Sequence, residues 1–142
     1  MKAAVLYHTG DIRYDDFPDP CCGKKDVIIK VAACGICGSD SPRILNQWKY
    51  PLPGVPGHEF AGTIVEKGSA VNHLQLGENV VAQPLIPCGV CENCRSGHIS
   101  VCDDITMLGA DIPGGYAEYV RVPASNVTVL GDVDLIQAAV LE

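Results

Sequence analysis

Residues 57–71 read GHEFAGTIVEKGSAV, and this stretch is the most informative part of the sequence. Its segment Phe60–Lys67 is rich in apolar and β-branched residues, which predicts a strand. His58 and Glu59 stand directly before that strand. Taken by itself, a histidine beside a glycine is more often a surface or core residue than a metal ligand, so this strand alone assigns no role to His58.

Further strands are predicted on both sides of this stretch. They are separated by glycine and proline, most densely in the loop that holds Pro51, Pro53 and Pro56. Many short strands with such breaks predict a mainly β domain, with a partly open barrel as its architecture. The predicted strands span residues 1–7, 26–33, 60–67, 79–83, 116–122 and 126–130.

Two short helices are predicted between or after these strands. Ser39 or Asp40 is expected to cap a helix through residues 42–45, since proline is tolerated in a first helical turn. The acidic run 132–134 is expected to begin a final helix that carries Leu135, Ile136, Ala139 and Val140. The exposed apolar face of that helix predicts association or aggregation of the 142-residue chain.

Composition and charge restrict the classes of function. The 142 residues are an ordinary length for one domain, and 47% are hydrophobic. A net charge of −7 argues against nucleic acid as a partner, because an acidic surface repels phosphates. No apolar run reaches the roughly 18 residues of a membrane span, and the first residues do not resemble a signal peptide. A soluble, cytoplasmic domain with no membrane partner is therefore expected.

Four of the eight cysteines are spaced as metal ligands. The pattern Cys88-x2-Cys91-x2-Cys94-x7-Cys102 offers four thiolates within one loop, and zinc accepts four sulfurs in a tetrahedron. A closed set of four sulfurs leaves no position for a substrate. The sequence therefore predicts a structural zinc site in a lobe, residues 88–102, that has no periodicity and is expected to lack regular structure.

Two alternatives to a zinc lobe are less consistent with the sequence. A redox-active or disulfide-bonded cluster is disfavoured because three cysteines at this pitch would be strained as disulfides. A nucleic-acid-binding zinc ribbon would need basic residues, yet Arg95 stands alone among Glu92, Asp103 and Asp104.

Several motifs in order resemble the medium-chain alcohol and polyol dehydrogenases. Residues 57–71 match the zinc signature of that family, and Gly35-Ile36-Cys37-Gly38-Ser39-Asp40 is similar to its first zinc-ligand turn. The cysteines of the lobe follow where the family has its structural zinc, and GGYAEY at 114–119 is similar to the next strand. The resemblance runs from residue 27 to residue 142. It implies the GroES-like fold of the family's N-terminal catalytic domain.

The resemblance also implies the residues of a catalytic zinc site. Cys37 and His58 correspond to two of the family's zinc ligands. Glu59 and Glu142 correspond to its carboxylate positions, and either glutamate is a candidate third ligand. A thiolate and an imidazole from distant segments are also what an open zinc site requires on chemical grounds.

Residues around these ligands are given supporting or packing roles. Asp40 is expected to orient a ligand and to balance charge, and Ser39 matches a hydroxyl that passes the alcohol proton toward solvent. Cys34 is expected to be a packing residue. Cys21 and Cys22 match no ligand position of the family, so no metal-binding role is assigned to them. Trp48 and Tyr50 are interpreted either as lining a substrate pocket or as covering the core.

The function implied by the resemblance is the zinc-dependent, NAD(P)-linked oxidation of a small alcohol. Two zinc ions per chain are expected, one catalytic and one structural. The run from Ser39 to Ile44 is similar to that of galactitol-1-phosphate dehydrogenases and sorbitol-type enzymes, so a polyol or a polyol phosphate is the expected substrate. The family resemblance also implies a homo-oligomer in the full-length enzyme.

No G-x-G-x-x-G or Walker-type loop occurs in the 142 residues. The nucleotide-binding domain is therefore expected to be absent from this chain, and residues 1–142 to be inactive alone.

Two classes of alternative function remain. One is another enzymatic branch, such as a threonine or formaldehyde dehydrogenase. The other is a stand-alone zinc-binding or co-chaperonin-like module without catalysis. The presence of Cys37, His58 and Glu59 favours chemistry over scaffolding, and it excludes a zinc-free quinone reductase of the same fold.

Overall fold

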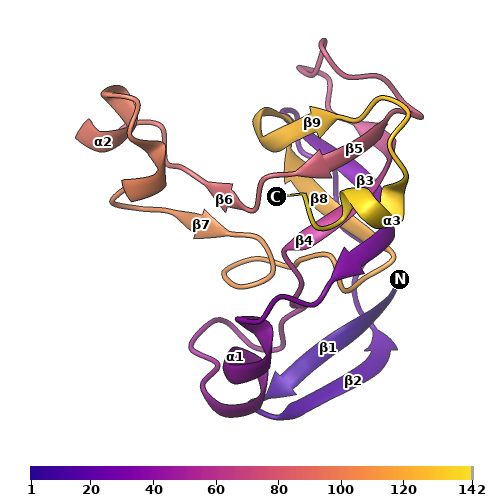
Figure 1. The fold of residues 1–142 in the computed structure, drawn as a ribbon, viewed down its shortest axis with the longest axis vertical. Coiled ribbons are helices and arrows are strands. Elements are labelled where there is room, and N and C mark those ends of the chain that lie inside the picture. Colours follow the sequence, from indigo (N-terminus) through magenta and orange to yellow (C-terminus); the bar gives the residue numbers. More distant parts are fainter. Residues whose placement is uncertain (142) are drawn as a thin grey trace.

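Antiparallel strands form most of the structure, a computed structural model that describes residues 1–141 (Figure 1). The central sheet has five strands in the order β8-β3-β4-β5-β9, and two hairpins, β1-β2 and β6-β7, flank it. The predicted mainly β class is confirmed. The strand bounds are β1 Lys2–His8, β2 Asp11–Asp16, β3 Asp26–Gly35, β4 Glu59–Lys67, β5 Asn79–Ala82, β6 Leu85–Ile86, β7 Thr106–Met107, β8 Tyr119–Pro123 and β9 Val127–Val129.

The central sheet curls into the predicted partly open barrel. β8 and β9 are its opposite edges, yet only the 3₁₀ turn Ala124–Asn126 separates them in sequence. That connection spans at most roughly 14 Å, whereas the edges of five flat strands would be roughly 19 Å apart. The buried side-chain amide of Asn126 donates to the carbonyls of Gln83 (3.1 Å) and Leu85 (2.8 Å), which fastens this crossing to the chain leaving β5.

The hydrophobic core lies inside the curl of this sheet. Alternate residues of β3, β4 and β8 point inward, as the period of a strand requires. Gly62 lies in the middle of β4, where a Cβ would collide with the carbonyl of Lys30, so glycine lets β3 and β4 approach closely. The fully buried core residues include Val27, Ile29, Phe60, Ile64, Val80, Leu108, Val120 and Val122.

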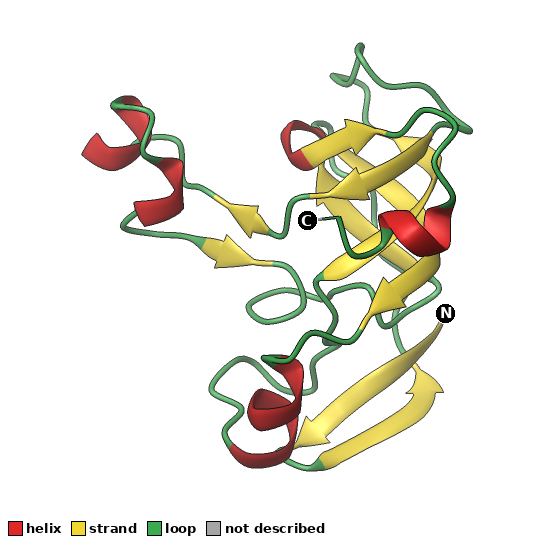
Figure 2. Ribbon diagram, in the orientation of Figure 1, coloured by secondary structure: helices red, strands yellow, loops and turns green. Residues whose placement is uncertain are grey.

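The helices are short and lie outside the sheet (Figure 2). α1 (Asp40–Asn46) follows β3 as predicted, but Ser39 makes no side-chain capping bond. α3 (Leu135–Ala138) begins at Asp134, whose carboxylate accepts from two backbone N–H groups, but it ends before the predicted Ala139 and Val140. Within the described residues no helix has the length and apolar character needed to cross a membrane.

The lobe and some of the strands also differ from the sequence-based expectations. The predicted absence of regular structure in the lobe is wrong, because it contains α2 (Glu92–Arg95) and the 3₁₀ turn Ile99–Val101. The two-residue strands β6 and β7 are absent from the predicted strands, and so is β2, of sequence DIRYDD. It is polar and largely exposed, so it has no apolar alternation; pairing with β1 makes it a strand.

Candidate metal centres

The four-cysteine lobe, residues 88–102, brings its four sulfurs together at the end of the β6-β7 hairpin (Figure 1). All four ligand atoms lie within 4.8 Å of one another. The sulfurs of Cys88 and Cys94 are 4.0 Å apart, as are those of Cys91 and Cys102. Sulfurs at 2.3 Å from a tetrahedral zinc are separated by roughly 3.8 Å, so this donor set fits zinc. All eight cysteines are free, which argues against the disulfide alternative.

Backbone N–H groups turn toward the sulfurs of the lobe. The N–H of Cys91 donates to the sulfur of Cys88, and the N–H of Cys94 donates to that of Cys91, both at 3.4 Å. The second bond makes Cys91 the N-cap of α2, so the two-residue spacing itself produces the helical turn. Donors from Val90 and Cys91 lower the pKa of the Cys88 thiol to about 7, whereas burial raises the pKa of Cys94 to about 12.

A second cluster, here named the mixed-ligand site, consists of Cys37, His58 and Glu59. Their ligand atoms also lie within 4.8 Å of one another. The site forms where the end of β3 meets the start of β4, since Gly35 pairs with Glu59 across the sheet. The cluster contains one thiol, one imidazole and one carboxylate, which is a donor set that zinc accepts.

His58 is the most buried member of the mixed-ligand site. It is 4% exposed, and its Nδ1 lies 3.3 Å from Oδ1 of Asp40, which is 3% exposed. The alignment of the two groups falls short of a hydrogen bond, so Nδ1 is a buried polar atom without a partner among the described residues. Buried polar groups are normally satisfied. Metal-binding histidines usually place one ring nitrogen against a carboxylate or carbonyl, and the contact of Nδ1 with Asp40 fits that arrangement.

Asp40 is held by two donors on its other oxygen. Oδ2 accepts from the backbone N–H of Cys37 at 3.1 Å and from the hydroxyl of Tyr116 at 2.8 Å. The same hydroxyl lies 3.2 Å from the carbonyl of Gly35. Burial, followed by the hydrogen bond to Asp40, raises the pKa of Tyr116 well above its ordinary value. Tyr116 belongs to a family motif of the sequence, but a tyrosine in a predicted strand gives no signal of this contact.

Ser39 contacts a predicted metal ligand instead of capping α1. Its hydroxyl donates to the sulfur of Cys37 at 3.3 Å, and its backbone N–H lies 3.5 Å from the same atom. The structure thus brings Ser39 next to the mixed-ligand site. Its predicted part in proton transfer stays a prediction.

Residues 23–132 match the family described as the alcohol dehydrogenase GroES-like domain. The chain belongs to this family. The predicted family and the predicted fold are both confirmed.

Individual relatives of this GroES-like domain are dehydrogenases. Sorbitol dehydrogenase of Bacillus subtilis (strain 168) is 34% identical and aligns with all of this chain and 42% of its own length. L-threonine 3-dehydrogenase of Rhizobium etli (strain CIAT 652) is 42% identical over 83% of this chain and 35% of its own. The crystal structure of galactitol-1-phosphate dehydrogenase from Escherichia coli superimposes with a TM-score of 0.93 at 36% identity. That match covers 98% of this chain and 41% of the other. The chain thus spans well under half the length of these relatives.

Other predicted positions of the GroES-like domain have varied outcomes. Cys34 packs against the core as expected, and burial raises its pKa to about 12, so it stays a thiol beside the mixed-ligand site. The side chain of Trp48 packs edge-on against Tyr50, with ring centroids 5.3 Å apart. Glu142 lies outside the described residues.

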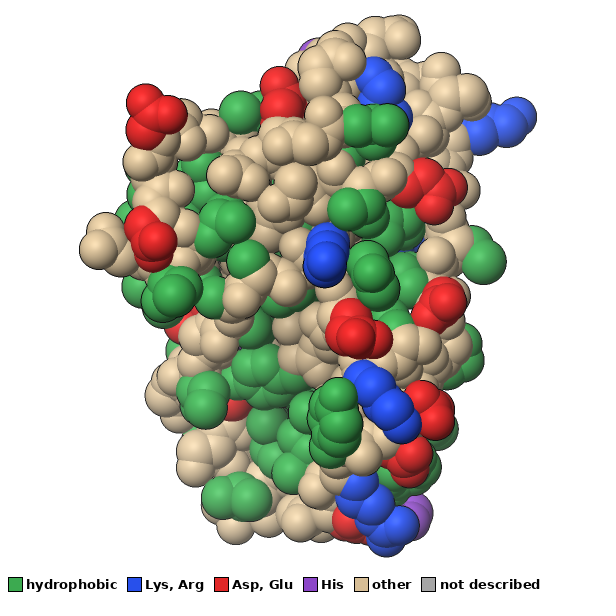
Figure 3. Space-filling view, turned by 90° about the vertical axis from the view of Figure 1, so that its right-hand side faces the viewer, with side chains coloured by type: hydrophobic (Ala, Val, Ile, Leu, Met, Phe, Trp, Pro, Cys, Tyr) green, Lys and Arg blue, Asp and Glu red, His purple; other side chains and the backbone are tan. Residues whose placement is uncertain are grey.

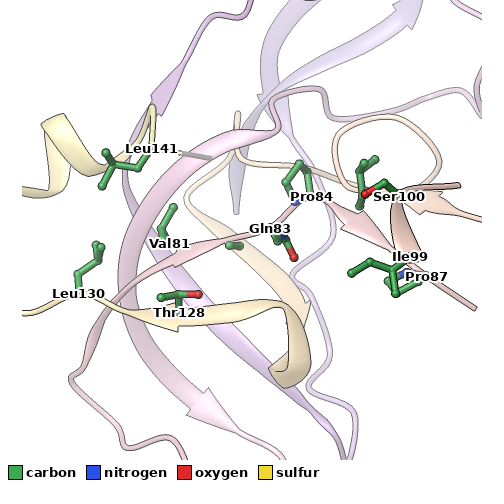
Figure 4. Close-up of a pocket in the computed structure, with 11 residues that line it drawn as sticks. Val81, Gln83, Pro84, Pro87, Ile99, Ser100, Thr128, Leu130 and Leu141 are labelled. Carbon is green, nitrogen blue, oxygen red and sulfur yellow. The ribbon is translucent and has the colours of Figure 1, made fainter. Parts of the chain in front are cut away.

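Two apolar cavities of the GroES-like domain are lined by residues other than the candidate ligands. One, of about 620 Å³, lies between the β5-β9 edge and the lobe, and Figure 4 shows Leu130, Leu141 and Ile99 around it. Another, of about 630 Å³, lies between the β1-β2 hairpin and the end of β3, and includes the exposed Tyr14 and Ile36. Figure 3 shows hydrophobic side chains gathered among charged ones on the face it presents. Neither cavity is lined by Cys37, His58 or Glu59.

Proposed function

We propose that residues 1–142 are the zinc-binding catalytic domain of an alcohol dehydrogenase that oxidises a secondary alcohol of a polyol or polyol phosphate. The observation that supports this most directly is the convergence of Cys37, His58 and Glu59. Three protein donors leave a fourth position of a tetrahedral zinc open for a substrate, whereas four cysteines close it. On this proposal each chain holds one catalytic and one structural zinc ion.

The residues of the mixed-ligand site have separate tasks in this proposal. Cys37, His58 and Glu59 would hold zinc, which when bound acts as a Lewis acid that lowers the pKa of an alcohol. Asp40 faces Nδ1 of His58 and so keeps Nε2 directed at the metal position. Glu142 is the alternative carboxylate ligand.

Ser39 is proposed to relay the proton that the alcohol loses: Oγ accepts that proton and releases its own hydroxyl proton toward solvent. Its hydroxyl already contacts the sulfur of Cys37, and Ser39 is only half-buried, so the proton has a short path from Oγ to solvent. Substitution by alanine would remove this path without removing a ligand.

The nucleotide that accepts the hydride is proposed to bind to a separate domain. The 142 residues contain no G-x-G-x-x-G, and the dehydrogenases they match are more than twice as long. NAD(P) is therefore proposed as the cofactor of the longer enzyme, and residues 1–142 as inactive alone. NAD-linked oxidation by the isolated chain would contradict this part of the proposal.

Three further properties complete the proposed function. Eight free thiols suit a reducing compartment, so we propose a cytoplasmic location. The substrate is a small molecule, and the full-length enzyme is proposed to be a homo-oligomer. Oxidation of L-threonine is the second candidate activity, because the threonine dehydrogenase of Rhizobium etli is 42% identical in the aligned part.

Elemental analysis of zinc tests the two-site proposal. Protein purified without added zinc should contain close to two zinc ions per chain, and Cys37→Ser and Cys91→Ser should each lose one. A single ion that is lost only in Cys91→Ser would contradict the catalytic site. Turnover of sorbitol, galactitol 1-phosphate and L-threonine by the longer enzyme then distinguishes the substrate branches.

A further inference from the structure

Tyr116 connects three segments that meet at the mixed-ligand site. Its hydroxyl reaches Oδ2 of Asp40 at the start of α1 and the carbonyl of Gly35 at the end of β3. Its ring lies against Gly57, the residue before His58. No other side chain of the described residues hydrogen-bonds to Asp40, apart from the close but misaligned contact with His58. The orientation of the Asp40 carboxylate therefore depends on the phenol and on one backbone N–H.

Backbone hydrogen bonds fix the position of this ring. The N–H of Tyr116 donates to the carbonyl of Pro56 at 3.0 Å, and its carbonyl accepts from the N–H of Ala4 at 2.7 Å. Gly57 has φ of +95°, and a Cβ there would lie 2.6 Å from Cδ1 of the Tyr116 ring. Glycine is thus required at 57 both by its own conformation and by the ring beside it. The hydroxyl consequently points at Asp40 with little freedom.

A carboxylate in this position controls the histidine behind it. With Oδ2 occupied by the N–H of Cys37 and the hydroxyl of Tyr116, Oδ1 is the oxygen left to face Nδ1 of His58. Groups that orient a metal-binding imidazole typically change metal affinity by about 10- to 100-fold when they are removed. A residue that orients such a group acts one step further away, and its effect should be smaller.

We propose that Tyr116 is a positioning residue of the mixed-ligand site, which holds the Asp40 carboxylate so that Oδ1 faces His58. This inference rests on the proposed function, since it assigns Tyr116 to the catalytic zinc. It concerns the hydroxyl alone, because a phenylalanine would keep the ring packing on Gly57. Tyr116→Phe is therefore the informative substitution.

The test measures metal binding at the mixed-ligand site, with no need for turnover. The affinity for zinc at the mixed-ligand site, here called the second zinc, is measured by competition with a chromophoric chelator. The proteins compared are the wild type, Tyr116→Phe and Tyr119→Phe. Cobalt bound at the same site gives a visible absorption spectrum that reports ligand geometry. Tyr119 is the matched control, because its hydroxyl makes no hydrogen bond among residues 1–141.

We expect Tyr116→Phe to lower the affinity for the second zinc by about three- to tenfold and to shift the cobalt absorption bands. The affinity for the lobe zinc should not change. Tyr119→Phe should stay within about twofold of the wild type. In an Asp40→Ala background, Tyr116→Phe should add no further loss, since the hydroxyl acts through that carboxylate. A full additional loss in that background would overturn the proposed route.

Two results separate this inference from the proposed function. Wild-type affinity and an unchanged cobalt spectrum in Tyr116→Phe, with both zinc ions retained, would overturn the role of Tyr116 alone. A wild type that holds zinc only in the four-cysteine lobe would overturn the proposed function and the role of Tyr116 with it. Loss of both zinc ions and of the circular dichroism signal in Tyr116→Phe would make the hydroxyl a determinant of folding, which also overturns positioning.

Discussion

The four-cysteine lobe and the mixed-ligand site bring their candidate metal donors together in opposite ways. The lobe takes all its ligands from fifteen consecutive positions, 88–102, and has no fully buried residue from Gly89 to Val101. The mixed-ligand site joins Cys37 to residues 58 and 59 across the β3-β4 pair, and His58 is 4% exposed. The first arrangement is local, and we expect its stability to depend on a bound metal. The second is built by the core of the barrel.

This difference predicts where each site is vulnerable. A lobe with little apolar material of its own gains its folding free energy from metal binding. A site between two core strands keeps its donors close as long as the strands stay paired. Substitutions in the core should therefore weaken metal binding at the mixed-ligand site and leave the lobe intact. Loss of the lobe zinc should unfold the lobe and leave the mixed-ligand site intact.

The largest effect is expected from Cys91→Ser. Structural zinc sites of this type contribute roughly 10–16 kcal/mol of binding free energy, and three sulfurs cannot replace four. Amide hydrogens of residues 88–102 should then exchange at the rate of an unfolded chain, while those of the five-stranded sheet stay protected, as measured by mass spectrometry. Cys21→Ser, at an exposed cysteine outside both clusters, is the control. Loss of protection throughout the sheet would contradict the independence of the two regions.

Phe60→Ala should have the next largest effect. Phe60 is completely buried, directly after Glu59, and its truncation should reduce the free energy of unfolding by about 3–5 kcal/mol. Urea unfolding measures this loss, and zinc titration should show a weakened mixed-ligand site with an intact lobe. Val90→Ala, at a lobe residue that is 66% exposed, should change stability by no more than about 0.5 kcal/mol. Equal losses in the two variants would refute the comparison.

Two glycines with positive φ sharpen the comparison further. Gly57 (φ +95°) is enclosed by Tyr116 and Cys34, whereas a Cβ added at Gly89 (φ +74°) would meet no other atom within 4 Å. Strain alone costs about 1–3 kcal/mol for an ordinary residue in such a conformation. Gly89→Ala should show only that strain, while Gly57→Ala should cost more because of the collision with the ring. Thermal unfolding of the zinc-loaded proteins measures both, and a larger loss for Gly89→Ala would count against the packing argument.

The smallest effect concerns thiol reactivity beside the mixed-ligand site. The pKa of Cys34 is raised to about 12, chiefly by burial, so roughly one ten-thousandth of it is thiolate at pH 8. Because the thiolate is the reactive form, its alkylation should stay slow at pH 8 and accelerate as the pH approaches 12. Iodoacetamide labelling of zinc-loaded protein, read by mass spectrometry, should modify the exposed Cys21 long before Cys34. Equal labelling of the two would show that Cys34 is not buried as a thiol.

Sequence alone predicted the candidate ligands of the lobe, because Cys88, Cys91, Cys94 and Cys102 are near neighbours in the chain. The two-residue spacing fixes how close their sulfurs can come. It did not predict the helical turn of α2, since N–H to sulfur bonds leave no hydrophobic period in the sequence. The candidate ligands Cys37, His58 and Glu59 were predicted only through the resemblance to a family.

The tertiary structure alone decided how those three donors meet and what surrounds them. The pairing of β3 with β4 brings Gly35 opposite Glu59, and the return of the chain after 113 places Tyr116 over Gly57 and against Asp40. Such contacts join residues up to 81 positions apart. No local pattern encodes them, because they follow from the curl of the whole sheet. The sequence determined which groups are available as candidate ligands, and the barrel determined which of them lie together.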